Sequence, residues 1–119
     1  MHPAEFGIVL RVRDLTKCRA FYRDVLDLGN PVIDSNFQSV FAIGEESSLC
    51  LEADTTAAAL SGQDDARMAL VLIPEDPEGV AERLESGGWT LRSRKEEHSS
   101  SGVLECRDPE GNRFYLQFS

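Results

Sequence analysis

The sequence predicts an α+β fold made of two βαβββ modules, in which one strand and one helix are followed by three strands. Three observations support this prediction. The same order of hydrophobic patterns occurs in both halves of the 119-residue chain. A stretch rich in Thr, Ala, Ser, Asp and Gly separates the halves. The turn at 107–112 runs into an alternating strand at 113–118. We expect a single domain, with module one at 5–53, a linker at 54–66 and module two at 67–119.

The first module begins with a strand in which Phe6, Ile8, Leu10 and Val12 alternate with other residues. Asp14 or Thr16 is a candidate helix cap. The helix that follows has an apolar stripe at three-and-four spacing and ends near Gly29; the stripe is Cys18, Phe21, Tyr22, Val25 and Leu26. Three short strands are expected next, at 32–35, 37–43 and 48–53, with turns at 36 and 44–46.

The second module begins with a strand at 68–73. Asp76 is expected to cap a helix with Pro77 in its first turn. Its inner face is Val80, Ala81 and Leu84, and it ends at Gly87-Gly88. Strands at 89–95, 103–107 and 113–118 complete the module. Because each helix covers one face of its strands, the other faces of the two half-sheets are left to enclose a ligand site.

Composition excludes several classes of function. The net charge of -9 repels phosphate backbones, and the twelve basic residues form no stripe, so we expect no nucleic-acid partner. No run of about 18 apolar residues and no export signal is present, which predicts a cytoplasmic protein without a membrane partner. The three cysteines Cys18, Cys50 and Cys106 have no CxxC spacing and are expected to be reduced thiols.

Two motifs carry a resemblance to a known family. Arg11-Val12-Arg13-Asp14-Leu15 leads into Phe21-Tyr22-Arg23-Asp24-Val25-Leu26, and Asp108-Pro109-Glu110-Gly111-Asn112 lies near the end. With the order of elements, these motifs resemble the vicinal oxygen chelate superfamily, which includes glyoxalase, extradiol dioxygenases, fosfomycin resistance enzymes and bleomycin resistance proteins. The resemblance covers essentially the whole chain. It implies sheets that form a U-shaped cleft, often within a homodimer.

The resemblance also implies four positions that hold a divalent metal in the enzymes of the superfamily. By motif position these fall on Gly7, Cys50, Met68 and Tyr115. None is an ordinary ligand for a hard divalent cation, because Gly has no side chain, Met prefers soft metals and a phenolate is costly at neutral pH. We therefore expect no metal and no other cofactor.

A shift of register by two residues is the alternative that would restore a metal site. With this shift Glu5, Glu52 and Gln117 become possible oxygen ligands. The first strand of the second module then has only Ala66 or Leu70 at its ligand position, and neither can bind a metal. Histidine does not help, since His2 lies near the terminus and His98 beside a serine-rich turn.

Catalysis without a metal is also weakly supported. Cys50 is a candidate nucleophile, but no base or positive charge is apparent nearby, so a packed thiol is the simpler interpretation. Glu52 is a candidate general base, although a carboxylate at a strand end is usually solvated.

The predicted function is metal-independent binding of a small organic ligand in the cleft between the modules. Strand alternation selects the candidate lining residues, with Trp89 and Phe41 as walls or as core residues; the set is Val9, Arg11, Phe41, Cys50, Glu52, Met68, Leu70, Trp89, Tyr115 and Gln117. Bleomycin resistance proteins are the nearest analogue within the resemblance, since they are similarly short, acidic and metal-independent. The alternatives are a metal-dependent lyase or dioxygenase with non-standard ligands, and an interaction module whose cleft is filled by its own side chains.

Overall fold

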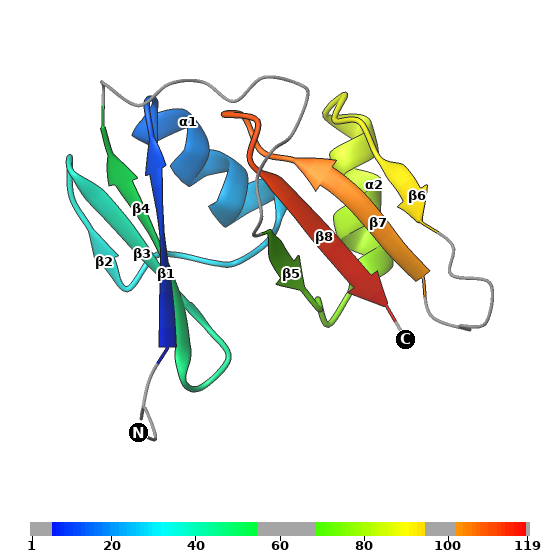
Figure 1. Ribbon diagram of the computed structural model, residues 1–119, viewed down its shortest axis with the longest axis horizontal. Helices are drawn as coiled ribbons and strands as arrows, with labels where there is room; N and C mark the ends of the chain where they lie inside the picture. Colours follow the sequence, from blue (N-terminus) through cyan, green and yellow to red (C-terminus); the bar gives the residue numbers. More distant parts are fainter. Residues whose placement is uncertain (1–5, 55–68, 95–101, 119) are drawn as a thin grey trace. The chain divides into compact units, whose positions relative to one another are not determined.

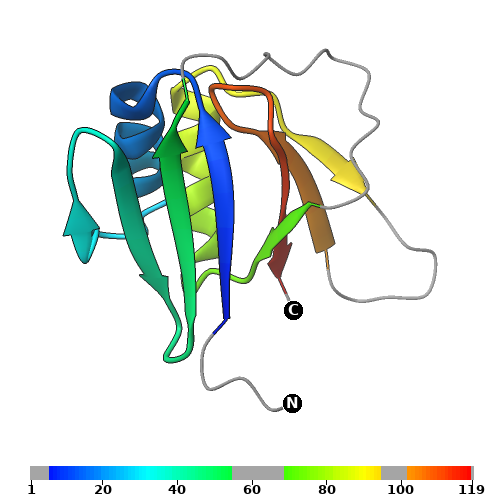
Figure 2. The ribbon, with the colours of Figure 1, turned by 60° about the vertical axis from the view of Figure 1, so that its left-hand side comes forward.

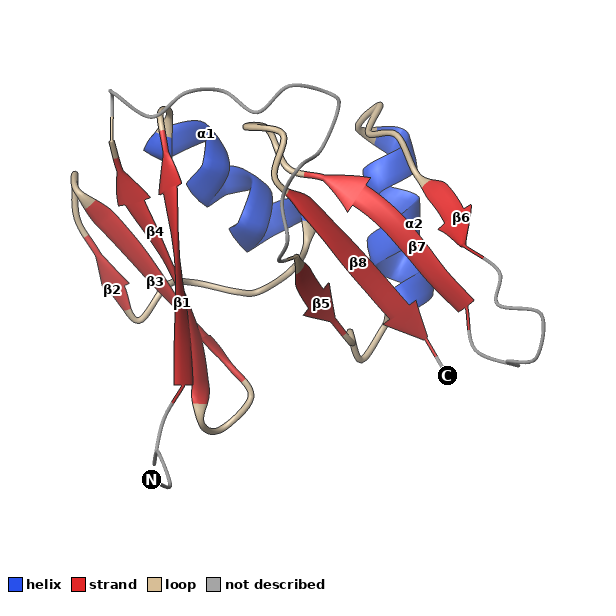
Figure 3. Ribbon diagram, viewed as in Figure 1, coloured by secondary structure: helices blue, strands red, loops and turns tan. Residues whose placement is uncertain are grey.

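The computed structural model describes residues 6–54, 69–94 and 102–118. The chain divides into two compact units, Met1–Ala59 and Leu60–Ser119, which are drawn in Figure 1. Each unit packs one helical segment against a four-stranded sheet, as the helix and strand colours of Figure 3 show. The predicted α+β fold with two βαβββ modules is confirmed. No helix in the described parts of the chain is both long and apolar enough to span a membrane.

The first unit contains one helical segment between its first and second strands. Its elements are β1 (Phe6–Val12), α1 (Leu15–Ala20), η1 (Phe21–Val25), β2 (Ile33–Asp34), β3 (Gln38–Ile43) and β4 (Ser47–Ala53). The strand order in the sheet is β1-β4-β3-β2. β1 runs parallel to β4, whereas the other neighbouring pairs are antiparallel. The first strand of the module therefore pairs with its last strand.

The second unit repeats this arrangement. Its elements are β5 (Leu70–Leu72), α2 (Pro77–Ser86), β6 (Arg92–Arg94), β7 (Gly102–Arg107) and β8 (Arg113–Phe118). The strand order is β5-β8-β7-β6, with β5 parallel to β8 and the remaining pairs antiparallel. β5 and β6 are shorter than the strands expected at 68–73 and 89–95, and Met68 and Lys95 lie outside the described residues.

Both helices begin at aspartates, of which Asp14 was one of two candidate caps and Asp76 was the expected cap. The side chain of Asp14 accepts a hydrogen bond from the backbone N–H of Lys17 at 3.0 Å. Asp76 does the same for Gly79 at 3.1 Å. Each bond satisfies a backbone donor that the first helical turn leaves without a partner. After α1 the chain widens into the π-helical turn η1, where the N–H of Leu26 donates to the carbonyl of Phe21 at 3.1 Å.

One face of each sheet is buried against the helix of its own unit, and we call it the covered face. α1 packs on β3 and β4, which Figure 2 shows for the first unit, and α2 packs on β8. The core side chains of the first unit are Val12, Leu15, Cys18, Phe21, Tyr22, Leu26, Phe41, Leu49 and Leu51, and those of the second are Leu70, Leu72, Val80, Leu84, Cys106, Phe114 and Leu116. Alternation along each strand turns the remaining side chains to the opposite face, which we call the open face.

A polar network crosses the covered side of the first sheet. Arg19 of α1 forms an ion pair with Asp34 of β2 at 2.8 Å and donates to the hydroxyl of Ser39 at 2.7 Å. The hydroxyl of Ser39, which is fully buried, donates to Asp34 at 2.7 Å. Because every member has a partner, the network avoids the cost of an unsatisfied buried polar group. It fixes β2 and β3 to the helix and so positions the open face on their other side.

Candidate ligand-binding faces

The open face of the first sheet is formed by rows of side chains that lie opposite one another on neighbouring strands. One row joins Val9 of β1, Cys50 of β4 and Val40 of β3, and continues to Ile33 of β2. The next row joins Arg11, Glu52 and Gln38. Val9 and Ile33 are exposed, so this face presents apolar surface beside a row of polar groups.

Cys50 is held in this face as a protonated thiol. Its Sγ donates to Oε1 of Gln38 at 3.8 Å. Partial burial, helped by the carboxylate of Glu52, raises the pKa of the Cys50 thiol above its ordinary value of 9.0. Both effects disfavour the thiolate, which is the nucleophilic form. The geometry therefore favours a contact role for Cys50 over covalent chemistry.

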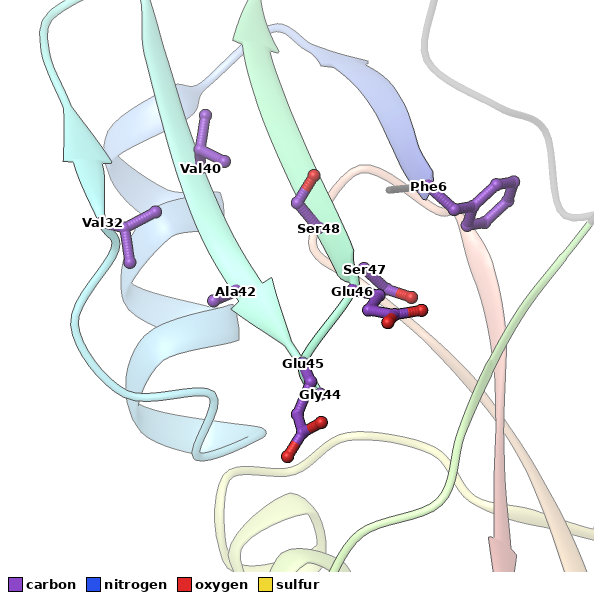
Figure 4. Close-up of a pocket in the computed structure, with 9 residues that line it drawn as sticks. All are labelled: Phe6, Val32, Val40, Ala42, Gly44, Glu45, Glu46, Ser47 and Ser48. Carbon is purple, nitrogen blue, oxygen red and sulfur yellow. The ribbon is translucent and has the colours of Figure 1, made fainter. Parts of the chain in front are cut away.

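A pocket of about 260 Å³ lies at one end of the open face of the first sheet. Figure 4 shows Val40, Ala42 and Ser48 on the hairpin formed by β3 and β4, with Glu45 and Glu46 at its tip. Val32 and Phe6 add apolar surface on either side. The volume is just below the roughly 300–1,000 Å³ of sites that enclose a drug-sized molecule. The pocket can therefore hold a small apolar group with polar atoms at its rim.

The open face of the second sheet is more polar. Arg92 of β6, Glu105 of β7, Tyr115 of β8 and Val71 of β5 form one row across the sheet. Nη1 of Arg113 lies 3.1 Å from Oε1 of Glu105 and donates to the hydroxyl of Tyr115 at 2.9 Å. The guanidinium of Arg113 also lies 6.0 Å from the centre of the Tyr115 ring, within the range of a cation–π contact.

The turn between β7 and β8 sets this register. Asp108 is buried, and its Oδ1 accepts hydrogen bonds from the N–H groups of Glu110 and Asn112 at 2.9 and 2.8 Å. Its Oδ2 accepts from the side-chain amide of Asn112 at 2.9 Å. Gly111 supplies the positive φ of 89° that the reversal needs, as the motif predicts. The turn places Arg107 opposite Arg113 on the open face.

Six of the candidate lining residues lie on open faces. Val9, Arg11, Cys50 and Glu52 belong to the first sheet, and Tyr115 and Gln117 to the second. Trp89 is half-buried, and its indole lies so close to Gly87 that a side chain on that glycine would meet Cδ1 at 2.9 Å. Met68 lies outside the described residues.

Phe41 and Leu70 are corrections to the expected lining, because both lie on covered faces. Phe41 is fully buried opposite Leu49, and Leu70 is buried opposite Phe114. In the second module the expected parity was off by one residue, since Val71 and not Leu70 shares the row of Tyr115. Sequence alternation also missed Phe6, Val32 and Val40, and no sequence signal marks them, since their place at the pocket depends on how the chain folds around the hairpin of β3 and β4.

The three described residues among the four inferred metal positions do not fit a divalent cation. Gly7 offers no donor, Cys50 is a thiol with a raised pKa, and the hydroxyl of Tyr115 already accepts a hydrogen bond from Arg113. Met68, the fourth position, is outside the described ranges. Within 6–54, 69–94 and 102–118, no three His, Cys, Asp or Glu side chains are grouped so that they could hold a metal ion.

Comparisons with known proteins agree with the fold. Residues 7–117 match the glyoxalase-like domain. Similar solved structures include a lactoylglutathione lyase from Agrobacterium tumefaciens, at 20% identity and a TM-score of 0.71, covering 98% of this chain and 94% of that chain. Another is the fosfomycin resistance protein FosX from Listeria monocytogenes, at 19% identity and a TM-score of 0.74, covering 98% and 93%. An integron cassette protein from the Halifax Harbour sewage outfall metagenome is 18% identical with a TM-score of 0.70, covering 97% of each chain.

A comparison with curated proteins found no match. The family match spans nearly the whole chain, from the second residue of β1 to the last strand of the second module. The resemblance that the two sequence motifs carry is thus confirmed at the level of the family, and the chain belongs to the glyoxalase-like domain family.

Proposed function

We propose that this protein binds a small organic molecule on the open face of a sheet and does so without a metal ion. The observation that carries the proposal is the pocket on the first sheet. It combines the apolar side chains of Phe6, Val32 and Val40 with the polar Ser48. A few polar groups within an apolar lining are typical of ligand sites.

The exposed apolar side chains give a physical reason for binding. Phe6 is 60% exposed, and Val32 is exposed as well. A ligand that covers these side chains gains roughly 25 cal/mol for each Å² of apolar surface that it removes from water. The lost freedom of the ligand opposes this gain, so we expect dissociation constants in the roughly micromolar to millimolar range.

The proposed absence of a metal rests on donor chemistry. Metal chelation in this fold needs several convergent oxygen or nitrogen donors, and Gly7, Cys50 and Tyr115 do not supply them. Elemental analysis of the purified protein tests this step. We expect no stoichiometric nickel, zinc, manganese or iron, and no loss of melting temperature with a chelator. A tightly held ion would instead favour a metal-dependent lyase or dioxygenase.

Binding itself is tested by a thermal shift screen against a library of small organic molecules, followed by titration of each hit. Phe6→Ser removes a pocket wall and should weaken binding by about tenfold, because roughly 1.4 kcal/mol of apolar contact is lost. Phe37→Ser is the matched control, since Phe37 is 77% exposed and does not line the pocket. If no compound raises the melting temperature, or if both variants weaken binding equally, the proposal fails. We also expect a homodimer, which light scattering of the purified protein will check.

A further inference from the structure

A group of arginines surrounds one carboxylate on the open face of the second sheet. Glu105 lies 3.1 Å from Arg113 and 3.9 Å from Arg92, through its two separate oxygens. Arg107 lies two residues further along β7, opposite Arg113. This group therefore combines three positive charges with one negative charge, within a chain whose net charge is -9.

The three arginines are held to different degrees. Arg113 is mostly buried between Glu105 and Tyr115, and Arg107 donates to the carbonyl of Gly111 at 2.8 Å. The side chain of Arg92 is 78% exposed, and its contact with Glu105 is at the long end of the range of an ion pair. Such an exposed pair contributes little to stability. The charge of Arg92 therefore has no evident role in holding the fold.

A small pocket lies beside this group. It has a volume of about 130 Å³ and is lined by Thr90, Arg92, Glu105, Cys106 and Arg107. This is well below the roughly 300 Å³ at which sites begin to enclose a whole drug-sized molecule. It is large enough for a single charged group. Guanidinium N–H groups and a threonine hydroxyl are the donors that oxyanions bind in proteins.

We propose that this pocket binds an oxyanion, either a carboxylate or a phosphate, carried by a ligand of the second sheet. The inference rests on the proposed function and adds the chemical class of the ligand. Arg92 supplies the contact that changes on binding, Thr90 donates its hydroxyl, and the guanidinium of Arg107 adds a second positive charge. Glu105 lowers the affinity of the site for the anion, because its negative charge repels the anion. Its carboxylate also holds Arg113 in place. Acidic residues more than about 8 Å away are largely screened at physiological salt.

The test titrates the whole protein with sodium phosphate, and separately with sodium acetate, against sodium chloride at equal ionic strength and pH. Trp89 is the only tryptophan of the chain and directly precedes Thr90, so its fluorescence reports on the pocket. We expect phosphate or acetate to change this fluorescence with saturation, whereas chloride does not. Saturation by phosphate alone assigns a phosphate group to the ligand, and saturation by acetate alone assigns a carboxylate.

Two variants and a control test which side chains bind the oxyanion. Arg92→Gln should weaken oxyanion binding by about tenfold, the effect of losing one charge-assisted hydrogen bond. Glu105→Gln should tighten it severalfold, since the amide still accepts from Arg113 but carries no charge. Arg23→Gln is the matched control, because Arg23 lies on η1, lines neither pocket and forms a partly exposed ion pair with its neighbour Asp24 at 2.9 Å. It should bind oxyanions as the wild type does.

The inference is overturned if neither oxyanion changes the fluorescence beyond the chloride control, or if Arg92→Gln and Arg23→Gln have equal effects. These outcomes differ from failure of the proposed function, which the library screen detects. If the organic hits are uncharged and Arg92→Gln does not change their affinity, the oxyanion site is contradicted while small-molecule binding is supported. Saturable phosphate binding without any organic hit would support the oxyanion site and contradict the proposed function.

Discussion

Replacing Asp108 with Ala should destabilise the protein more than any other single change to a turn carboxylate. Asp108 is buried, and its Oδ1 accepts from two backbone N–H groups at 2.9 and 2.8 Å. Hydrogen bonds to a charged group contribute roughly 1.5–3 kcal/mol each. Taking the lower value for the two backbone bonds, because water can reach part of the turn, gives a loss of about 3 kcal/mol in the free energy of unfolding. The third bond, from the amide of Asn112, is left out because that side chain can turn to solvent.

Thermal and urea unfolding, followed by circular dichroism, measure this loss. At about 2.1 cal/mol/K of unfolding entropy per residue, 3 kcal/mol lowers the melting temperature of a chain of this length by about 12 °C. Asp14→Ala is the control, because the carboxylate of Asp14 is exposed and caps a helix with one backbone bond of 3.0 Å. It should cost about 1 kcal/mol. If Asp108→Ala costs no more than Asp14→Ala, the buried turn carboxylate does not stabilise the hairpin as argued.

Three further predictions concern packing, backbone and thiol chemistry. Phe41→Ala should cost about 3–5 kcal/mol in urea unfolding because Phe41 is fully buried, whereas Val9→Ala, on the open face, should cost less than about 1 kcal/mol; equal costs would show that the two faces are not distinct. Gly29→Ala should cost about 1 kcal/mol, since Gly29 has a φ of 79°, and an unchanged melting temperature would contradict this. Burial raises the pKa of the Cys106 thiol from its ordinary 9.0 to about 12, so the folded protein keeps a proton that the unfolded chain loses. The Cys106 thiol should therefore leave the free energy of unfolding unchanged below pH 9 and lower it as the pH rises from 9 toward 12. Cys106→Ala should remove this decrease with pH. A decrease that persists in the variant would show that it does not come from Cys106.

The elements could be predicted because their signals are local. Asp14 and Asp76 cap their helices through bonds to residues three positions later, and Gly111 has the positive φ that its turn requires. The π-helical turn could not be foreseen. Its bond from Leu26 to Phe21 leaves the same buried stripe as an α-helix would, so the spacing of apolar residues does not distinguish the two.

The open faces were harder to predict than the strands themselves. Residues 68–73 are apolar at every position, so alternation does not choose between Leu70 and Val71. The pairing with β8 decides that Val71 lies opposite Tyr115. Phe41 alternates with Val40 in the same way, and contact with α1 decides which of them is buried. The arginines around Glu105 come from three strands, so no local pattern could bring Arg92 and Arg113 to one carboxylate.

The parallel pairing of β1 with β4 has a consequence for synthesis on the ribosome. Phe6 has no strand partner until Ser47 has been translated, and Leu70 waits in the same way for Phe114. Long-range pairing of this kind slows folding and leaves apolar strands unprotected while the chain grows. The nascent first module therefore spends several seconds with β1 uncovered at about 5–20 residues per second, and chaperone capture is expected to be greatest in that interval.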